Sequence, residues 1–408
     1  MIFTLLLFFI ILQMNVKKNS VSYILVLLYI VTLCANFLIG TDLGMHGFCD
    51  VLYVIWTAVV LSFLFMPWSS YEPINSFAIC NERALMRFVY VVGALCLFMT
   101  IGCAAIAYAV NLVVEDINVF KYRGEQQEVY ASIGMSMKPY LLAYIFYPIS
   151  YLFIPLIFYY LSRKKYGLML ICFFSSLSSV TFGLAYFSRS HTTQYVLLLL
   201  VSYWMFRNTL SCKLRKIIGK IGLILIILIG TSFFAISNSR FEDKDYVGQK
   251  SDAVIKNTVA YSLADYTGMW WYAGRDVFED FQFETMNGKI ALQGVNRALN
   301  MLTLGLIPSN VEKNAIKREK LLKENSGGFI GVSAYFLYDT GVIISLIILL
   351  VYFNLVRKNR PKNSVMTPTQ AMLFIILIML PLFGIFYSTL DVIILLLLYY
   401  LPIKKILL

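Results

Sequence analysis

Two arginines follow directly after long apolar runs, where a guanidinium would meet the edge of a membrane. Arg189 stands in the sequence Tyr-Phe-Ser-Arg-Ser-His, and Arg240 stands in Ser-Asn-Ser-Arg-Phe. A guanidinium stays charged and grips phosphate oxygens through a planar fork. Because charged side chains at membrane depth are rare and mark functional sites, the two arginines predict a clamp for a pyrophosphate at headgroup depth. Alternatively, each side chain only reaches out to the membrane surface.

A histidine lies close to the first of these arginines. His191 is two residues after Arg189 and is one of 2 histidines in the chain. An imidazole can donate to a phosphate or accept a proton near neutral pH, so we predict that His191 is catalytic. The competing interpretation is a histidine that only packs at the membrane interface.

The apolar run that begins at Phe329 carries two further candidate features. Ser326, Gly327 and Gly328 precede it, and Asp339 lies about ten residues into it. A serine and glycines at a helix N-terminus expose backbone N–H groups that suit an anion, so these three residues are predicted to bind substrate. A carboxylate at the depth of Asp339 is expected to face a polar cavity or an arginine. Glycine and serine also begin many helices without binding anything.

Arg275 is the last candidate for substrate binding. It follows Trp270, Trp271 and Tyr272, and the four side chains together could form a surface that faces a sugar. Aromatic residues are also enriched where a helix meets the membrane–water interface, so an aromatic belt is the other interpretation of this segment.

We expect no metal and no cofactor. The sequence holds no metal-ligand spacing, no nucleophile elbow and no phosphate-cradling glycine motif. Asp243 and Asp245 have the spacing of a metal-holding pair, but Lys244 separates them and we interpret them as solvated. A glycosyl transfer by this chain would then rely on arginine to stabilise its leaving group.

Long apolar runs must position these residues, and most of them approach the length of about 20 residues that a membrane-spanning helix needs. The first, seventh and last runs are short for a full crossing. About eleven such spans are predicted, and together they leave no room for a separate soluble domain. The predicted spans are 2–15, 21–40, 51–67, 88–112, 140–162, 167–187, 194–206, 217–237, 329–355, 371–387 and 391–402.

Lysines and arginines cluster at every second junction between these spans. Basic residues in short loops stay on the cytoplasmic side during insertion, so the alternation predicts an outside N-terminus and a cytoplasmic C-terminus. The clusters are Lys17-Lys18, Arg83 with Arg87, Arg163-Lys164-Lys165, residues 207–220, residues 357–362 and Lys404-Lys405.

Composition agrees with a membrane protein and excludes a nucleic-acid-binding one. The apolar fraction of 60% is above that of soluble domains. The net charge of +12 is explained by the cytoplasmic clusters, which would lie against anionic lipid headgroups. No soluble basic surface with interleaved stacking aromatics is present, so no nucleic acid is expected as a partner. The 7 cysteines form no C-x-x-C pair, which gives no support to a disulfide framework or a zinc site.

The predicted fold is all-α, a polytopic transmembrane helix bundle that forms a single domain over residues 1–408. One large outer loop, residues 238–328, separates spans eight and nine. Long loops are translocated regardless of their charge, so its basic residues do not contradict the topology. Helical spacing over residues 254–271 predicts an amphipathic helix on the membrane surface. A short outer turn, residues 188–193, joins spans six and seven.

The layout resembles the O-antigen polymerase family, the oligosaccharide repeat-unit polymerases of bacterial surface-polysaccharide synthesis. The similarity rests on the many spans, the arginine in the short outer turn and the Arg240-Phe241 pair that opens the long loop. It rests also on Gly327 to Gly331, which leads through Tyr335, Asp339 and Gly341 into the next span. Family members often have glycine after the first arginine, where this chain has Ser190 and His191.

The resemblance implies an enzyme of the bacterial inner membrane with a periplasmic N-terminus and a cytoplasmic C-terminus. Such a glycosyltransferase joins repeat units carried on undecaprenyl pyrophosphate into O-antigen or capsular polysaccharide at the outer face, without a metal. Its implied partners are the undecaprenyl-pyrophosphate-linked oligosaccharide, membrane lipids and a chain-length regulator protein.

Two other functions remain open from the sequence. An O-antigen ligase uses the same donor but transfers the glycan to a lipid core. A transporter or flippase of lipid-linked oligosaccharides would spread charged residues through many spans, whereas the predicted spans here are nearly free of charge and Asp339 is the chief exception.

Overall fold

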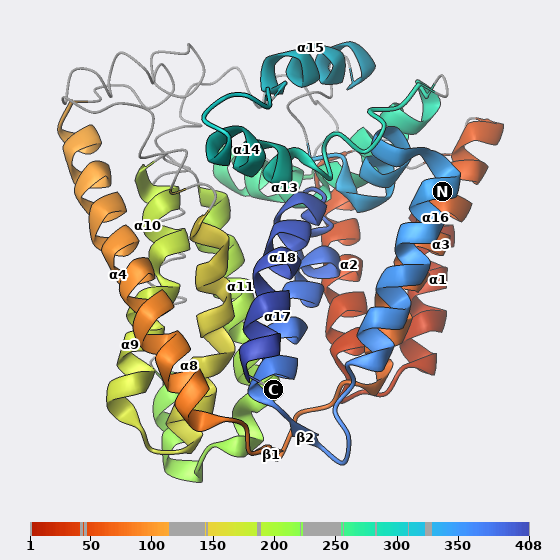
Figure 1. The fold of residues 1–408 in the computed structure, drawn as a ribbon. Helices are drawn as coiled ribbons and strands as arrows, with labels where there is room; N and C mark the ends of the chain where they lie inside the picture. Colours follow the sequence, from red (N-terminus) through yellow and green to blue (C-terminus); the bar gives the residue numbers. More distant parts are fainter. Residues whose placement is uncertain are drawn as a thin grey trace.

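The computed structural model describes residues 2–40, 44, 47–113, 143, 146–185, 189–220, 222, 254–255, 257–281, 284–308, 310–322 and 329–407. Over these residues the chain forms a bundle of α-helices (Figure 1). Five helical stretches are long and apolar enough to cross a membrane: Val21–Leu38, Phe48–Ser70, Glu82–Val110, Tyr166–Ala185 and Gly331–Lys358. By helix length and composition, the described structure is therefore compatible with an α-helical membrane protein.

Most predicted spans coincide with helices, although several boundaries differ. The first half of the described chain contains α1 (Ile2–Asn15), α2 (Val21–Leu38), α3 (Phe48–Phe65), the 3₁₀ turn η1 (Met66–Ser70) and α4 (Glu82–Val113). It continues with η2 (Tyr147–Leu152), α8 (Phe153–Ser162), α9 (Tyr166–Ser176), α10 (Ser178–Ala185), α11 (Arg189–Phe206) and η3 (Arg207–Thr209). The predicted span 167–187 is thus two helices, which meet at Leu177. Most of the predicted span 217–237 lies outside the described residues.

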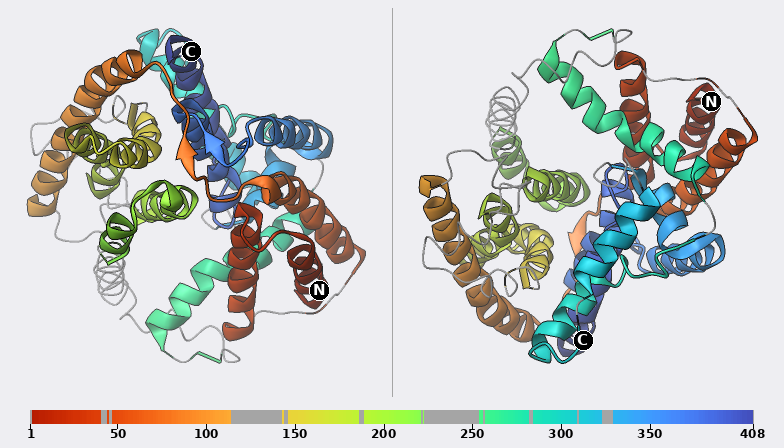
Figure 2. Two further views of the ribbon diagram at one scale, coloured as in Figure 1. Left: turned by 90° about the horizontal axis from the view of Figure 1, so that it is seen from below. Right: turned by 90° about the horizontal axis from the view of Figure 1, so that it is seen from above.

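The second half of the described chain contains six helices. These are α13 (Thr258–Glu279), α14 (Gln293–Leu302), α15 (Val311–Leu322), α16 (Gly331–Lys358), α17 (Pro368–Phe383) and α18 (Leu390–Leu407). In projection along the bundle, α4 and α8–α11 lie on one side of α18, and α1–α3 with α16 lie on the other (Figure 2). Helix α17 packs against α3, α8, α11, α16 and α18, so it joins the two sides.

Helix α17 is buried all round, as expected of a helix without a polar face. It begins with a capping box, in which the Thr367 side chain accepts from the Gln370 N–H and the Gln370 side chain accepts from the Thr367 N–H. Near its other end Pro381 lacks an N–H, which frees the carbonyl of Leu377 four residues earlier. The Tyr352 hydroxyl of α16 donates to that carbonyl at 3.0 Å. The Tyr29 hydroxyl of α2 donates to the Pro381 carbonyl at 3.1 Å.

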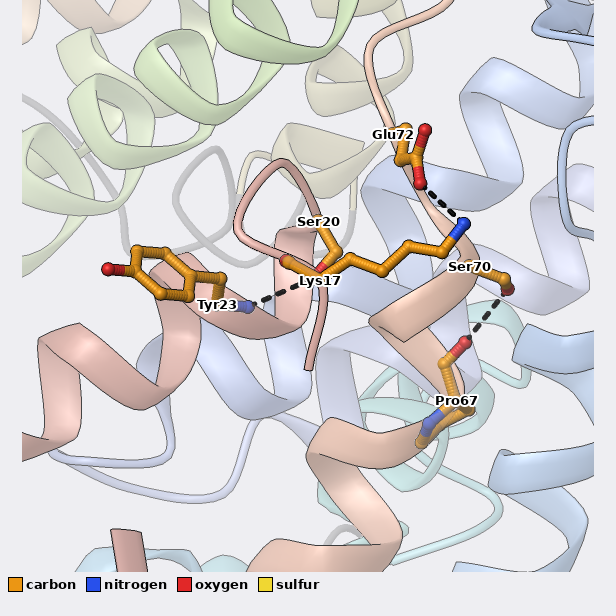
Figure 3. Close-up of polar contacts among 6 residues, drawn as sticks. All are labelled: Lys17, Ser20, Tyr23, Pro67, Ser70 and Glu72. Carbon is orange, nitrogen blue, oxygen red and sulfur yellow. Dashed lines mark hydrogen bonds and ion pairs between the residues drawn. The ribbon is translucent and has the colours of Figure 1, made fainter. Parts of the chain in front are cut away.

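One end of the bundle holds all six basic clusters. Helix α18 carries Lys404 and Lys405 to this end, where the segment after α3 also crosses the bundle (Figure 1). Lys17 Nζ lies 2.8 Å from Glu72 Oε1, beside the Ser20 side chain that caps α2 (Figure 3). Lys165 Nζ lies 2.9 Å from Glu82 Oε2. The structure thus brings together at one end the basic residues that the sequence places on one side.

A small parallel sheet ties this basic end together. Strand β1 (Ser76–Phe77) follows η1, and strand β2 (Val365–Met366) precedes α17. Ser76 pairs with Val365 and Phe77 pairs with Met366. The neighbouring Ile74 N–H donates to the carbonyl of Met205 at the end of α11. Segments from both sides of the bundle are therefore joined by backbone hydrogen bonds.

Helices α13, α14 and α15 lie at the opposite end (Figure 1). Helix α13 covers the ends of α2, α3 and the start of α16. Trp270 and Trp271 are each 1% exposed. The Trp270 indole donates to Thr32 Oγ1 of α2 at 3.2 Å, and the Tyr53 hydroxyl of α3 donates to the Trp271 carbonyl at 3.1 Å. The prediction of a helix in this segment is confirmed, but its tryptophans pack on the bundle and do not form an aromatic belt.

Helix α16 is interrupted at Gly341, which has φ 72° and ψ 176°. Every residue from Gly331 to Thr340 is buried, whereas Val342, Ile343 and Ile344 are exposed, as a lipid-facing surface would be. A side chain in this backbone region is strained because its Cβ collides with the chain, so glycine is required. Gly341 therefore separates a buried first part of α16 from a membrane-length second part.

Gly341→Ala is expected to destabilise the protein by about 1–3 kcal/mol through backbone strain. Crowding contributes little, because an added Cβ would meet its nearest neighbour, Thr285 Cγ2, at 3.5 Å. The measurement is the midpoint of thermal unfolding in detergent, which should fall by several degrees. Gly102→Ala in α4 is the matched control, because nothing lies within 4 Å of its added Cβ. Equal midpoints for the two variants would contradict the role of Gly341.

Candidate functional site

Helix α11 begins at Arg189, so the predicted short turn over residues 188–193 is wrong from its second residue onward. Arg189, Ser190, His191, Thr192 and Thr193 form the first turns of this helix. Polar residues can begin a helix as readily as they form a loop, since the first N–H groups of a helix are open to polar partners. Arg189 is therefore positioned by the helix start, and its side chain lies outside the described residues.

His191 packs among aromatic rings. Its ring centroid lies 5.1 Å from that of Tyr147 and 5.3 Å from that of Phe182, in both cases edge to face. Tyr147 and Phe182 are themselves stacked at 4.7 Å. The Ser190 Oγ lies 3.4 Å from His191 Nδ1. This environment holds the imidazole by apolar contacts, and it favours the interpretation of His191 as a packed interfacial histidine over that of a catalytic base.

The Asp339 carboxylate accepts hydrogen bonds from backbone amides, and no arginine is among its partners within the described residues. Its two carboxylate oxygens accept from the N–H groups of Ile290 at 3.1 Å and Ala291 at 2.9 Å. Its carbonyl accepts from Gly288 N at 2.8 Å. These contacts fix the segment before α14 onto the first part of α16, and the predicted role of Asp339 in substrate binding stays a prediction.

Arg275 is held by carboxylates of its own helix. Its Nε lies 3.7 Å from Asp276 Oδ1 and 3.5 Å from Glu279 Oε1, and its side chain is 16% exposed. Burial raises the pKa of Glu279, and the positive charge of Arg275 offsets part of this increase. The same arginine acts electrostatically on Tyr53 of α3. Arg275 thus belongs to the packing of α13 on α3, away from the start of α11.

Four of the predicted site residues cannot be placed. Arg240, Ser326, Gly327 and Gly328 lie outside the described residues. Their predicted roles remain predictions.

The structure brings together a set of charged and phenolic side chains, of which only Tyr335 belongs to a sequence motif described above, and we call it the arginine–tyrosine cluster. It lies at the end opposite the basic clusters. Its members are Arg297 of α14, Arg318 of α15, Tyr335 of α16, Tyr387 of the turn before α18, and Asp391 of α18. Arg318 Nη2 donates to the Tyr335 hydroxyl at 3.3 Å. Asp391 lies within electrostatic range of Arg297, and both tyrosines lie within electrostatic range of Asp391.

The cluster reaches the start of α11 through Tyr387. The Ser190 side chain and Tyr151 of η2 both lie close enough to the Tyr387 hydroxyl to act on it electrostatically. The Tyr151 hydroxyl in turn donates to Gln194 Oε1 at 3.0 Å. The backbone of Arg189 is therefore one residue from a side chain that lies close to the cluster. Of the predicted residues, Arg189, His191 and Asp339 are brought toward this place.

The sequence gives little indication that these residues come together. Asp391 is an acidic residue at the start of the predicted span 391–402. Acidic residues commonly stabilise helix N-termini, so its position alone does not indicate a site. Arg297 and Arg318 are two of many charged residues in the long loop. Only the packing of α14 and α15 against α16 and α18 distinguishes them from solvated residues.

The cluster combines groups that bind anions with groups that bind hydroxyls. Two guanidinium groups can hold phosphate or sugar oxygens, a carboxylate can accept a hydroxyl proton, and the phenols can donate or accept. Among the described residues no group of three or more histidine, cysteine or acidic side chains could hold a metal ion. The arrangement is suited to a ligand that carries both phosphate and sugar.

Comparison with known proteins finds no relative. Neither a family model, nor a curated protein, nor a solved structure matches this chain. The resemblance noted in the sequence therefore rests on its short motifs, of which Arg240-Phe241 and the first two residues of Gly327 to Gly331 lie outside the described residues.

Proposed function

We propose that this chain polymerises oligosaccharide repeat units carried on undecaprenyl pyrophosphate, at the outer face of a bacterial inner membrane. The observation that supports it most is the convergence of the start of α11, where Arg189 stands, with the arginine–tyrosine cluster at the end away from the basic loops. Basic clusters favour the cytoplasmic side, so the cluster would face outward at the depth of lipid headgroups. That is where a lipid pyrophosphate presents its bond to sugar.

The reaction would need binding and electrostatic stabilisation, with no added energy source. The sugar–pyrophosphate bond is already activated, and the arginines would stabilise the negative charge that grows on the leaving pyrophosphate. In this proposal Arg189 and Arg240 hold the pyrophosphate, and the loop that contains α13, α14 and α15 covers the site from outside. About eleven crossings, a periplasmic N-terminus, a cytoplasmic C-terminus and a chain-length regulator as partner belong to the same proposal.

Orientation can be tested by cysteine labelling. In a variant whose 7 cysteines are replaced, a membrane-impermeant thiol reagent added outside should label Lys320→Cys on α15 and spare Lys362→Cys at the basic end. Both lysines are exposed, so access to each is decided by the membrane. Labelling after lysis should reach both positions equally, which is the control. Labelling of Lys362→Cys alone in intact cells would invert the proposed topology.

The proposed function is tested by the glycan profile of a strain without this chain. A polymerase predicts that the ladder of long glycans disappears while single repeat units still reach the acceptor. A ligase predicts the converse, with lipid-linked polymer that accumulates and an acceptor that carries no glycan. The profile is read from electrophoresis of the surface glycan and from extracted lipid-linked material. An unchanged profile would contradict both enzymes.

Arg189→Ala is expected to reduce polymerisation by about 30- to 1000-fold, since a charge-assisted contact to the leaving group is worth about 2–4 kcal/mol. Arg189→Lys should remain poor, because an ammonium cannot reproduce the planar fork. Both variants are measured by ladder length and by protein amount in the membrane. Arg87→Ala, an exposed arginine at the basic end, is the matched control and should retain the full ladder. Full ladders from both Arg189 variants would remove Arg189 from the site.

A further inference from the structure

Asp391 differs from Asp339 in what surrounds its carboxylate. Each carboxylate oxygen of Asp339 accepts a hydrogen bond from one backbone N–H, and the two bonds fix the segment before α14. The Asp391 carboxylate lies in the first turn of α18, where nearby backbone N–H groups and Arg297 act on it electrostatically. A carboxylate offers about four acceptor positions, so these local contacts leave capacity for an incoming hydroxyl.

Helix α14 holds a cation beside this carboxylate. A Cβ added to Gly294 would lie 3.2 Å from the Asp391 carbonyl oxygen, so the α14 backbone packs directly on the start of α18. Arg297 follows Gly294 by three residues and therefore lies on the same face of α14. It acts electrostatically on Asp391. A substituent at position 294 would push α14 and its arginine away from the carboxylate.

Within the described residues, buried polar atoms without a hydrogen-bond partner occur on Arg318, a member of the cluster, on Tyr338, which contacts Tyr335, and on Thr389, two residues before Asp391. The Tyr338 hydroxyl and Thr389 Oγ1 belong to side chains that are 2% and 0% exposed, and neither has a hydrogen-bond partner within the described part of the chain. The same holds for Arg318 Nε. The ring centroids of Tyr338 and Tyr335 are 5.3 Å apart. Arg318 and Asp339 act electrostatically on the Tyr338 hydroxyl. An unpaired buried polar group costs about 1–3 kcal/mol, which a polar ligand would recover.

The mixture of groups favours a sugar over a free phosphate. A phosphate needs donors only, and the carboxylates of Asp391 and Asp339 would repel it. A sugar hydroxyl donates to a carboxylate and accepts from a guanidinium or a phenol, so it satisfies both kinds of group at once.

We propose, on the basis of the proposed function, that the arginine–tyrosine cluster binds the acceptor sugar and that Asp391 takes the proton from its attacking hydroxyl. The hydroxyl oxygen forms a bond to the anomeric carbon of the donor, and the bond from that carbon to the pyrophosphate oxygen breaks. The proton goes to the Asp391 carboxylate, and the bonding electron pair leaves with undecaprenyl pyrophosphate. Arg297 counters the charge of the carboxylate before the transfer.

The test uses the full chain, purified in detergent, and lipid-linked repeat units extracted from the strain that lacks it. Asp391→Asn keeps the shape of the side chain but cannot accept the proton, so the turnover rate should fall by at least about 100-fold. The apparent affinity for the lipid-linked donor should stay within a factor of about three, since a proton acceptor contributes to kcat and not to donor binding. Glu319→Gln, an exposed acid on α15, is the matched control and should keep the wild-type rate.

The outcomes separate this inference from the function on which it rests. Wild-type protein that makes no polymer from these units would overturn the proposed function itself. A wild type that polymerises and an Asp391→Asn variant with the same rate would overturn only the role of Asp391. If Asp391→Asn does not accumulate, Asp391→Glu decides, because it keeps a carboxylate displaced by one methylene. It should polymerise at a reduced but measurable rate, and a rate equal to that of wild type would count against a positioned base.

Discussion

In the core of the helix bundle, backbone N–H and C=O groups must find hydrogen-bond partners within the protein, and the rest of the structure depends on this constraint. Helix α17 is buried on every side, and Pro381 deprives it of one hydrogen bond. Within a membrane each unsatisfied group is costly, so the freed carbonyl needs a donor from another helix. Tyr352 of α16 donates to Leu377, Tyr29 of α2 donates to Pro381, and the Val332 N–H donates to the Gly384 carbonyl. The end of α17 is thereby attached to α2 and to the first part of α16, which carries Tyr335 and Asp339.

The same attachments explain why the cluster is assembled where it is. The turn after α17 contains Tyr387 and leads into Asp391, so its position follows from the fixed end of α17. Asp339, two residues before the break at Gly341, holds the segment before α14 and brings Arg297 toward α18. The site thus joins residues from five elements because each element is anchored by backbone contacts in the core. A polar cluster at the end of a helix bundle can be kept ordered in this way.

Hydropathy predicted the helices well because a membrane imposes one dominant rule on every span. Runs such as 21–40 and 329–355 correspond to α2 and α16, and the alternation of basic clusters anticipated their gathering at one end. Hydropathy says little about polar helix ends, so the sequence predicts a turn where the structure has the start of α11 at Arg189. Hydropathy also does not reveal contacts between residues that are distant in the chain. Asp339 accepts hydrogen bonds from amides about fifty residues earlier, and Arg318 reaches Tyr335 only through the packing of α15. The buried position of Trp270 and Trp271 was missed for the same reason.

The parallel pair of β1 and β2 has a consequence for how the protein is made. Its two strands come from the first and last quarters of the chain, Ser76 pairing with Val365. Chains are synthesised from the N-terminus and fold progressively as they emerge. Strand β1 must therefore wait with its hydrogen-bonding edge open until nearly the whole protein has been inserted. Closure of this pair is a late event in biogenesis, and a ribosome that stalls before β2 leaves a bundle whose two sides have not been fastened at the basic end.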